Sequence, residues 1–159
     1  MGSGVDVEAF SGSLDWKQFE GLAELAFESF GYQTVRNFRM PKPRMEIDLL
    51  ATSKKVAFAV DCKHWKRTVG HATMLALAEK QVKRCRSLVR TGRANNVIPV
   101  ILTLHDEFLT VLENGVAIVP VHKISDFILN WDSSDKVRVI KNRRLRDTSQ
   151  KANGNSATL

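Results

Sequence analysis

The run Val97–Leu104 constrains the fold of this chain more than any other segment. It is apolar over eight residues apart from Pro99 and Thr103. This is far shorter than the roughly 20 apolar residues of a membrane-spanning helix, and a short continuous apolar run is typical of a strand buried on both faces. Such strands occur where helices cover both faces of a sheet. The sequence therefore predicts a layered α/β domain with no membrane span.

Helical and strand patterns alternate around this run. Helices are predicted over Asp15–Phe30, His71–Arg90, Asp106–Leu112 and Ile124–Trp131. The other strands are predicted over Tyr32–Phe38, Glu46–Ala51, Val56–Lys63 and Val116–Val121. Arg39–Arg44 is expected to interrupt the first pair, because each of its prolines removes a ladder donor. A hairpin that gains strands through helical crossovers gives a mixed β-sheet flanked by helices, with an αβββαβ core.

The length of 159 residues corresponds to one domain. We expect it to span residues 14–133, between a flexible leader over 1–13 and a basic, partly disordered C-terminal tail over 134–159. Cys62 and Cys85 lie in segments predicted to be buried, and the first thirty residues show no signal-peptide pattern. Reduced thiols and a cytoplasmic, nucleoid-associated protein are therefore expected.

Positive charge is distributed unevenly. The formal net charge is +7, and residues 136–159 contain seven basic residues against one acid. A second cluster has Glu79 as its only acid and comprises Lys80, Lys83, Arg84, Arg86, Arg90 and Arg93. Such clusters favour a polyanionic partner, most simply nucleic acid. The alternative is a solvated helix face with a solubilising tail.

Two neighbouring strands supply the candidate chemistry. Side chains alternate between faces along Val56–Lys63, so Asp61 and Lys63 share one face with two small alanines. A tight turn makes Glu46–Ala51 the adjacent strand and brings Asp48 beside Asp61. Converging carboxylates require a proton or a cation between them, and ligand sets made only of oxygen favour Mg²⁺ or Mn²⁺. A simple Asp–Lys surface pair is the alternative.

Two helices offer further side chains to this place. On Asp15–Phe30, Glu20 borders the apolar stripe, whereas Glu28 points to solvent. On His71–Arg90, Gln81 lies at the border of the core stripe. Glu20 and Gln81 are therefore the helical residues predicted to lean toward the acidic strands.

These residues together resemble the PD-(D/E)xK nuclease superfamily, which has an acid on the first helix, a lone Asp and an (Asp/Glu)-x-Lys at the end of a strand. Here Asp61 follows Asp48 by thirteen residues. Within the superfamily, the chain is similar to the Mrr-type restriction endonuclease domain and to archaeal Holliday-junction resolvases over about residues 14–131. The matching segments are Trp16–Glu20, Gly31-Tyr32, Glu46–Ala51 and Val60–Trp65, with Gln81 matching a glutamine of the Mrr-like branch.

The resemblance implies metal-dependent hydrolysis of DNA phosphodiester bonds. It implies that Mg²⁺ or Mn²⁺ is held by Glu20, Asp48, Asp61 and the backbone carbonyl of Cys62. It also implies that Lys63 positions the attacking water and that Gln81 supports the site or touches the phosphate. For a single domain, cutting both strands is most easily achieved by a twofold homodimer.

Seven basic residues are the candidates for DNA contact: Arg39, Lys42, Arg44, Lys66, Arg67, Lys83 and Arg84. The first three belong to the proline-containing loop before Asp48, where phosphate contact is expected. The chain contains no glycine-rich phosphate loop, nucleophile elbow or Cys-x-x-Cys pair. No nucleotide cofactor and no serine or thiol chemistry are therefore expected.

Three classes of function are open at this point. The leading hypothesis is a Mg²⁺-dependent DNA endonuclease, with a structure-specific junction resolvase or repair nuclease as its nearest variant. The second is a DNA-binding module whose nuclease site is weak or inactive. The third is a structural role in which the basic tail serves a protein partner.

Overall fold

The computed structural model describes residues 14–65 and 67–143. Its core elements are helix α2 (Trp16–Ser29), strands β1 (Gln33–Pro41), β2 (Arg44–Thr52) and β3 (Ala57–Lys63), helix α3 (His71–Arg90) and strand β4 (Asn96–Thr103). Then follow β5 (Thr110–Val111), β6 (Ala117–Pro120), the 3₁₀ turn η1 (Val121–Lys123), α4 (Ile124–Asn130), η2 (Trp131–Ser133) and β7 (Ile140–Lys141). The predicted αβββαβ core is therefore confirmed.

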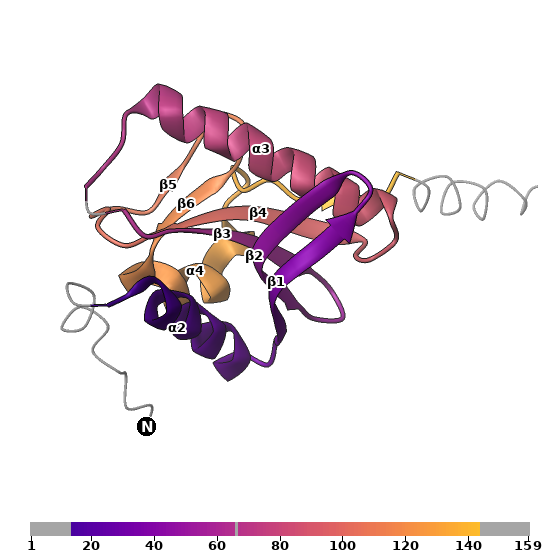
Figure 1. Ribbon diagram of the computed structural model, residues 1–159, viewed down its shortest axis with the longest axis horizontal. Helices are drawn as coiled ribbons and strands as arrows, with labels where there is room; N and C mark the ends of the chain where they lie inside the picture. The colour runs from indigo at the N-terminus through magenta and orange to yellow at the C-terminus, as the bar shows by residue number, and fades with distance from the viewer. Residues whose placement is uncertain (1–13, 66, 144–159) are drawn as a thin grey trace, which may run out of the picture.

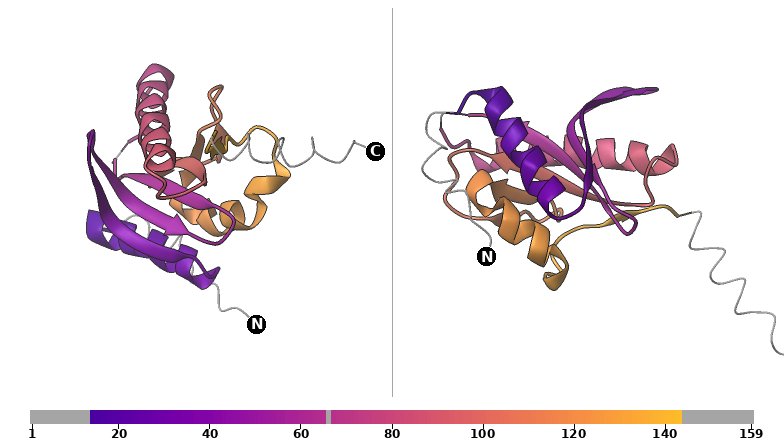
Figure 2. Two further views of the ribbon diagram at one scale, coloured as in Figure 1. Left: turned by 90° about the vertical axis from the view of Figure 1, so that its right-hand side faces the viewer. Right: turned by 90° about the horizontal axis from the view of Figure 1, so that it is seen from below.

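Within the described residues the strands form one mixed sheet in the order β1-β2-β3-β4-β6-β5, and β7 pairs with β4. The β1–β2 and β2–β3 pairs are antiparallel, whereas β3, β4 and β6 run parallel. Helix α3 covers one face of the sheet, and α2 and α4 cover the other (Figures 1 and 2). The three-layer arrangement explains why β4 is apolar from Val97 to Leu102 and buried over nearly its whole length: it has helices on both sides. No helix in the described part of the chain combines the length and apolarity of a membrane span.

Helix α2 begins and ends where its sequence provides caps. The Asp15 carboxylate accepts a hydrogen bond from the Gln18 N–H at 2.8 Å, and the Gln18 side chain accepts the Asp15 N–H at 3.0 Å. Such a capping box satisfies two donors that the first turn leaves without partners. At the other end Gly31 adopts φ +85°, a conformation that costs glycine little. The buried stripe of α2 includes Phe19 and Phe27.

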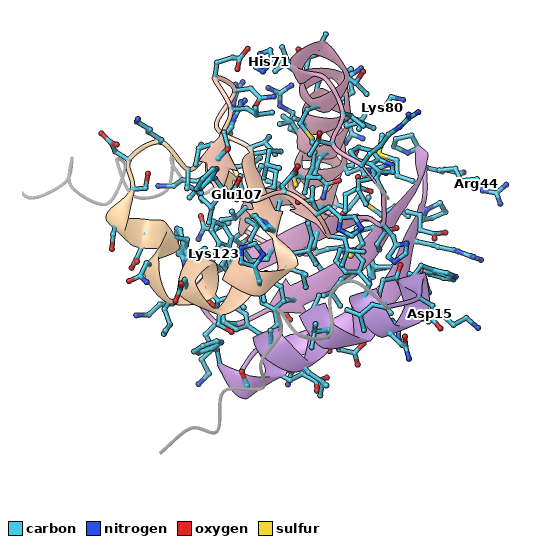
Figure 3. The ribbon with its side chains drawn as sticks, turned by 90° about the vertical axis from the view of Figure 1, so that its left-hand side faces the viewer. Asp15, Arg44, His71, Lys80, Glu107 and Lys123 are labelled. Carbon is cyan, nitrogen blue, oxygen red and sulfur yellow. The ribbon has the colours of Figure 1, made fainter. Side chains whose placement is uncertain are left out.

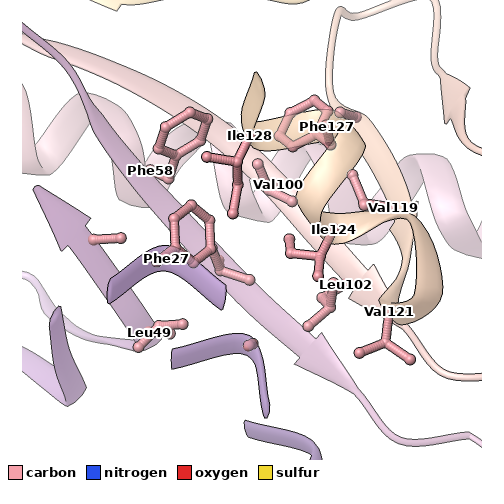
Figure 4. Packing of buried hydrophobic residues seen from close by; sticks show 14 of the residues in the cluster. Phe27, Leu49, Phe58, Val100, Leu102, Val119, Val121, Ile124, Phe127 and Ile128 are labelled. Atoms are coloured by element: carbon pink, nitrogen blue, oxygen red, sulfur yellow. The ribbon is translucent and has the colours of Figure 1, made fainter. Parts of the chain in front are cut away.

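The core on the α2 and α4 side is built around Phe58 of β3. Its ring centroid lies 5.2 Å from that of Phe27 and 5.9 Å from that of Phe127, and Figure 4 shows these rings together. The neighbouring residues Ala57 and Ala59 belong to the cluster on the α3 side. The predicted alternation along β3 is therefore confirmed, and the small side chains allow α3 to pack close to the strand.

Two local predictions are wrong. The prolines do not interrupt the first hairpin: β1 continues to Pro41, which pairs with Arg44. This is tolerated because β1 is an edge strand, so a missing N–H breaks no ladder on its outer side. The predicted helix Asp106–Leu112 is absent as well, since Thr110 and Val111 pair with Ile118 and Ala117 in a hairpin.

The hairpin replaces the helix for two reasons. A three-residue loop over 113–115 connects its strands: the Gly115 N–H donates to the Leu112 carbonyl at 2.8 Å, and Gly115 has φ +83°, as in the common hairpin loop whose last residue is left-handed. The Phe108 side chain is 70% exposed, so residues 106–112 lack a buried helical stripe.

The first part of the predicted basic tail belongs to the sheet. Ile140 pairs with Val97 and is buried, and Lys141 pairs with Asn96. The Asn142 N–H donates to the Asn95 carbonyl at 2.9 Å. Residues 1–13 and 144–159 of the predicted leader and tail lie outside the described residues.

Candidate active site

Strand β2 separates from β3 at Asp48. The last paired residues are Leu49 and Val60, and one further step would place Asp48 opposite Asp61. Instead, Oδ2 of Asp48 accepts a hydrogen bond from the backbone N–H of Cys62 at 2.8 Å. The carboxylate thus replaces a backbone acceptor where the ladder stops.

The separation coincides with a kink in β1. Asn37 has φ 52° and lies between the pairs Arg36–Leu49 and Phe38–Ile47, opposite Asp48. Asn is among the few residues that visit this left-handed region readily. The backbone of β1 is therefore left-handed opposite the first candidate acid, at the level where β2 stops pairing with β3.

Asp61 lies between two cations. Its Oδ2 is 3.0 Å from Nζ of Lys63, and its Oδ1 is 3.3 Å from Nη1 of Arg84. The Asp61 side chain is only 6% exposed. The Lys63 contact lacks hydrogen-bond geometry, so Oδ2 is a buried oxygen without a hydrogen-bond donor. Asp61 is consequently held by charge attraction on one oxygen and by a hydrogen bond from Arg84 on the other.

Gln81 is fully buried and does not face solvent. Its Nε2 donates to the Ala59 carbonyl at 2.7 Å and lies 3.5 Å from the Val100 carbonyl. Pro99 of β4, which has no N–H, pairs with Ala59. Gln81 therefore supplies a donor beside the position where proline removes one, and its Oε1 accepts from Nη1 of Arg84 at 3.0 Å. In this way α3 is tied to β3 and Arg84 is oriented toward Asp61.

Glu20 is buried on α2, and its carboxylate is paired with Arg36. The Glu20 Oε2–Arg36 Nη2 distance is 2.9 Å, and Glu24 lies 3.6 Å from Nε of the same arginine. The hydrogen bond from Arg36 to Glu20 raises the pKa of the guanidinium. Glu20 thus lies on the face of the sheet opposite to α3, and its charge is paired with that of Arg36.

The carboxylates influence one another. Burial raises the pKa of Asp48 to about 6, aided by the charges of Asp61 and Glu20 and opposed by the Cys62 N–H and by Lys63. Burial together with the same three acids also raises the pKa of the Cys62 thiol well above its ordinary value. At neutral pH this thiol is protonated and is no nucleophile. The local potential is negative and favours a cation.

The donor set fits a hard divalent cation. It consists of oxygens: the Asp48 oxygen not used by Cys62, the Asp61 Oδ2 without a hydrogen bond, and the Cys62 carbonyl. Mg²⁺ and Mn²⁺ prefer such ligands. Among the described residues, however, no three Asp, Glu, His or Cys side chains are already grouped as metal ligands. A bound cation would compete with Lys63 and Arg84 for Asp61.

The candidates for DNA contact are scattered over the surface. Arg39 is exposed and pairs with Glu46 at 2.9 Å, and Figure 3 shows Arg44 at the edge of the molecule, pointing away from it. Lys42, Arg67 and Lys83 are also exposed, and Lys66 lies outside the described residues. Arg84 differs from the others because it contacts Asp61. Its spacing of three residues from Gln81, on the same helix face, is the signal that would have indicated this position.

Comparison with known proteins identifies the family of this chain. The model of a restriction endonuclease family, Mrr_cat, matches residues 12–98, more than half of the chain. The chain belongs to this restriction endonuclease family. The matched range includes Glu20, Asp48, Asp61, Lys63 and Gln81. No protein among the curated sequences matches.

Two solved structures are similar to this member of the family. One is the small subunit of the heterodimeric restriction endonuclease R.BspD6I, with 14% identity, a TM-score of 0.49 and coverage of 92% of this chain and 87% of that chain. The other is a protein of unknown function, AF1548, with 21% identity and a TM-score of 0.42. That match covers 54% of this chain and spans 46% of the other chain.

Proposed function

We propose that this restriction endonuclease domain hydrolyses phosphodiester bonds of DNA with Mg²⁺ or Mn²⁺ at the site formed by Asp48, Asp61 and Lys63. Family membership supports a nuclease. The observation that supports this site is the half-buried Asp48, whose pKa is raised to about 6 beside Asp61 at the point where β2 leaves β3. Burying a carboxylate beside a second one adds no stability to a fold, and groups with pKa values shifted in this way cluster at functional sites.

Each residue has a role that its contacts suggest. Asp48, Asp61 and the Cys62 carbonyl would hold the cation, with Glu20 adding negative charge from α2. A divalent cation in such a site activates water and neutralises charge on the phosphate. Lys63 directs its ammonium at the same Asp61 oxygen that the cation would use. Lys63 is therefore free, once displaced, to hold a water or a phosphate oxygen nearby.

Arg84 and Gln81 position Asp61 through a chain of contacts. Gln81 is anchored to the carbonyls of β3 and β4 and accepts a hydrogen bond from Arg84. Arg84 in turn contacts Asp61 at 3.3 Å. We assign Gln81 a positioning role, because its side chain is fully buried and contacts no solvent.

A second candidate function is DNA binding without cleavage. It is favoured by the cations that already compensate the acids, namely Arg36 on Glu20 and both Lys63 and Arg84 on Asp61. A site whose carboxylates are satisfied in this way binds metal only if the metal competes with these pairs. Under this alternative the protein retards DNA in EDTA and cuts nothing at any Mg²⁺ or Mn²⁺ concentration.

A cleavage assay separates the two candidates. Supercoiled plasmid, single strands and a four-way junction are incubated with Mg²⁺, Mn²⁺ or EDTA, and products are resolved on one gel. Asp48→Asn, which keeps an acceptor for the Cys62 N–H, and Lys63→Ala should abolish cutting and retain DNA binding. Asp135→Asn and Lys123→Ala are matched controls outside the site.

The outcomes are distinct. Metal-dependent cutting that is lost in both site variants and kept in both controls supports the proposed site, and the preferred substrate identifies a resolvase or a restriction-like enzyme. Full cutting by Asp48→Asn or Lys63→Ala contradicts the assignment. DNA retardation by a wild-type protein that never cuts supports the second candidate. The homodimer expected from the sequence is tested separately by the mass of the protein in solution.

A further inference from the structure

A basic groove lies at the C-terminal end of α3, away from the candidate active site. It has a volume of about 910 Å³ and is lined by α3 residues near its end, by the following turn and by residues 138–143. The lining contains five cationic side chains and no acid: Arg86, Arg90, Arg138, Lys141 and Arg143. None of the candidate catalytic residues is part of it.

The groove joins two basic clusters that are separate in the sequence. Arg86 and Arg90 come from the cluster on α3, whereas Arg138, Lys141 and Arg143 come from the start of the basic C-terminal segment. The second group is held in place by the pairing of β7 with β4 and by the hydrogen bond from the Arg138 N–H to the Gly115 carbonyl at 2.9 Å. The positive charges are thus fixed on the domain by backbone contacts.

These charges are not compensated within the described part of the chain. The ion pairs found there involve Arg36, Arg39, Lys63, His71 and Arg84, and none of the five groove cations. A helix C-terminus offers a charge of only about −0.5, which offsets a fraction of one cation. A concave surface with this excess of positive charge fits a ligand with several closely spaced negative charges.

The groove is too far from the site to hold the phosphate that is attacked. Asp61 pairs with Ile101 of β4, whereas Lys141 pairs with Asn96 of the same strand. Five residues of strand separate these levels, which corresponds to about 17 Å at 3.3 Å per residue. In Figure 1, α3 crosses the molecule from the end of β3 toward the start of β4.

We infer that this groove binds the phosphodiester backbone of DNA several nucleotides away from the bond that is cut. This inference rests on the proposed function for its choice of DNA as the polyanion. Successive phosphates of one strand of B-DNA advance by about 3.4 Å along the helix axis, so a separation of about 17 Å along that axis corresponds to about five nucleotides. The groove would hold the DNA, and the acidic site would act on it.

The test measures DNA affinity in EDTA, where cleavage plays no part. The full chain and an Arg90→Glu/Lys141→Glu variant are titrated into a labelled 30-base-pair duplex at several salt concentrations. Lys123→Glu/Lys136→Glu is the matched control, with the same change in net charge outside the groove. An Arg90→Gln/Lys141→Gln variant and a thermal melt of each protein guard against misfolding.

We expect the groove variants to bind at least about fivefold more weakly than the control pair. Because each lost phosphate contact removes about 0.9 from the slope of log K against log salt, the slope should fall by about 1.8. Equal losses in the groove and control variants overturn the inference, since net charge alone then explains binding. The proposed nuclease activity is tested separately by the cleavage assay. If the wild-type protein shows no metal-dependent cutting, the proposed function fails, but the affinities measured in EDTA are unaffected.

Discussion

The charge of Asp48 should destabilise the folded protein at neutral pH, so its removal should stabilise it. The pKa of Asp48 is raised from 3.8 to about 6 in the folded state, chiefly by burial. A carboxyl with a raised folded pKa favours folding when protonated, so its favourable contribution is complete below pH 3.8 and is lost as pH rises through 6. Asp48→Asn removes the charge and retains an oxygen that accepts the Cys62 N–H.

The magnitude follows from the gap between the two pKa values. A gap of about 2.2 at 1.36 kcal/mol for each pH unit gives an upper bound of about 3 kcal/mol. Asp48 is only half-buried, so solvent screening reduces this value. We expect Asp48→Asn to be more stable than wild type by about 1–2 kcal/mol at pH 8, which corresponds to a Tm increase of about 2–8 °C for a chain of this size.

Thermal melts between pH 3.5 and pH 8 provide the test. The difference in stability between Asp48→Asn and wild type should be near zero at pH 3.5. It should grow between about pH 4 and pH 6 and remain constant above, because the pKa of Asp48 is raised in the folded state. Asp135→Asn, at an exposed position, should show no such pH dependence. An Asp48→Asn protein that is equally or less stable than wild type at pH 8 would refute the reasoning.

Three further predictions concern a loop, the core and one charge pair of the site. Gly115→Ala should lose at least about 1 kcal/mol of unfolding free energy, because Gly115 has φ +83° and a Cβ there would lie 2.6 Å from Cβ of Arg138. Gly21→Ala is the control, since Gly21 lies inside α2 and a Cβ there meets nothing within 4 Å; it should gain about 0.5–1 kcal/mol in urea unfolding. An equal response of the two variants would contradict the structure. Phe58→Ala should lower the unfolding free energy by about 3–5 kcal/mol in the same measurement, since this fully buried ring contacts aromatic residues of α2 and α4. A loss below about 1 kcal/mol would show that the ring is not central to the core. Arg84→Met should lower the unfolding free energy by about 1–3 kcal/mol at pH 7, because it leaves the buried Asp61 without its hydrogen bond. Lys83→Met, at an exposed position, should change the stability little. Similar effects of both substitutions would contradict the role of Arg84 at the site.

Metal removal is the remaining prediction. A ligand that binds only the folded state adds about 1.4 kcal/mol at ten times its Kd, so saturating Mg²⁺ should raise the Tm of wild type by about 3–6 °C. EDTA should abolish this increase, and Asp48→Asn should show none. A Tm of wild type that is unchanged by Mg²⁺ or Mn²⁺ at any concentration would count against the metal site.

Patterns that depend on near neighbours in the chain were predictable. The period of an amphipathic helix set His71–Arg90, which the structure reproduces at both ends. The two-residue alternation of a strand placed Asp61 and Lys63 on one face, and their side chains are 3.0 Å apart. The short turn between β2 and β3 predicted that these strands are neighbours, with Asp48 close to β3, and Asp48 contacts the Cys62 N–H of β3. These features follow from backbone geometry over a few residues, so the sequence by itself determined them.

Features that depend on distant residues were decided by the tertiary structure. Arg84 reaches Asp61 across 23 residues of sequence, and Arg36 reaches Glu20 across 16. The pairing of β7 with β4 brings the C-terminal cations to the end of α3. No local periodicity specifies which cation meets which acid, because that choice depends on how helices and strands pack. The sequence therefore determined which residues lie on the faces that form the acidic site, whereas packing decided how their charges are paired and which cations gather in the basic groove.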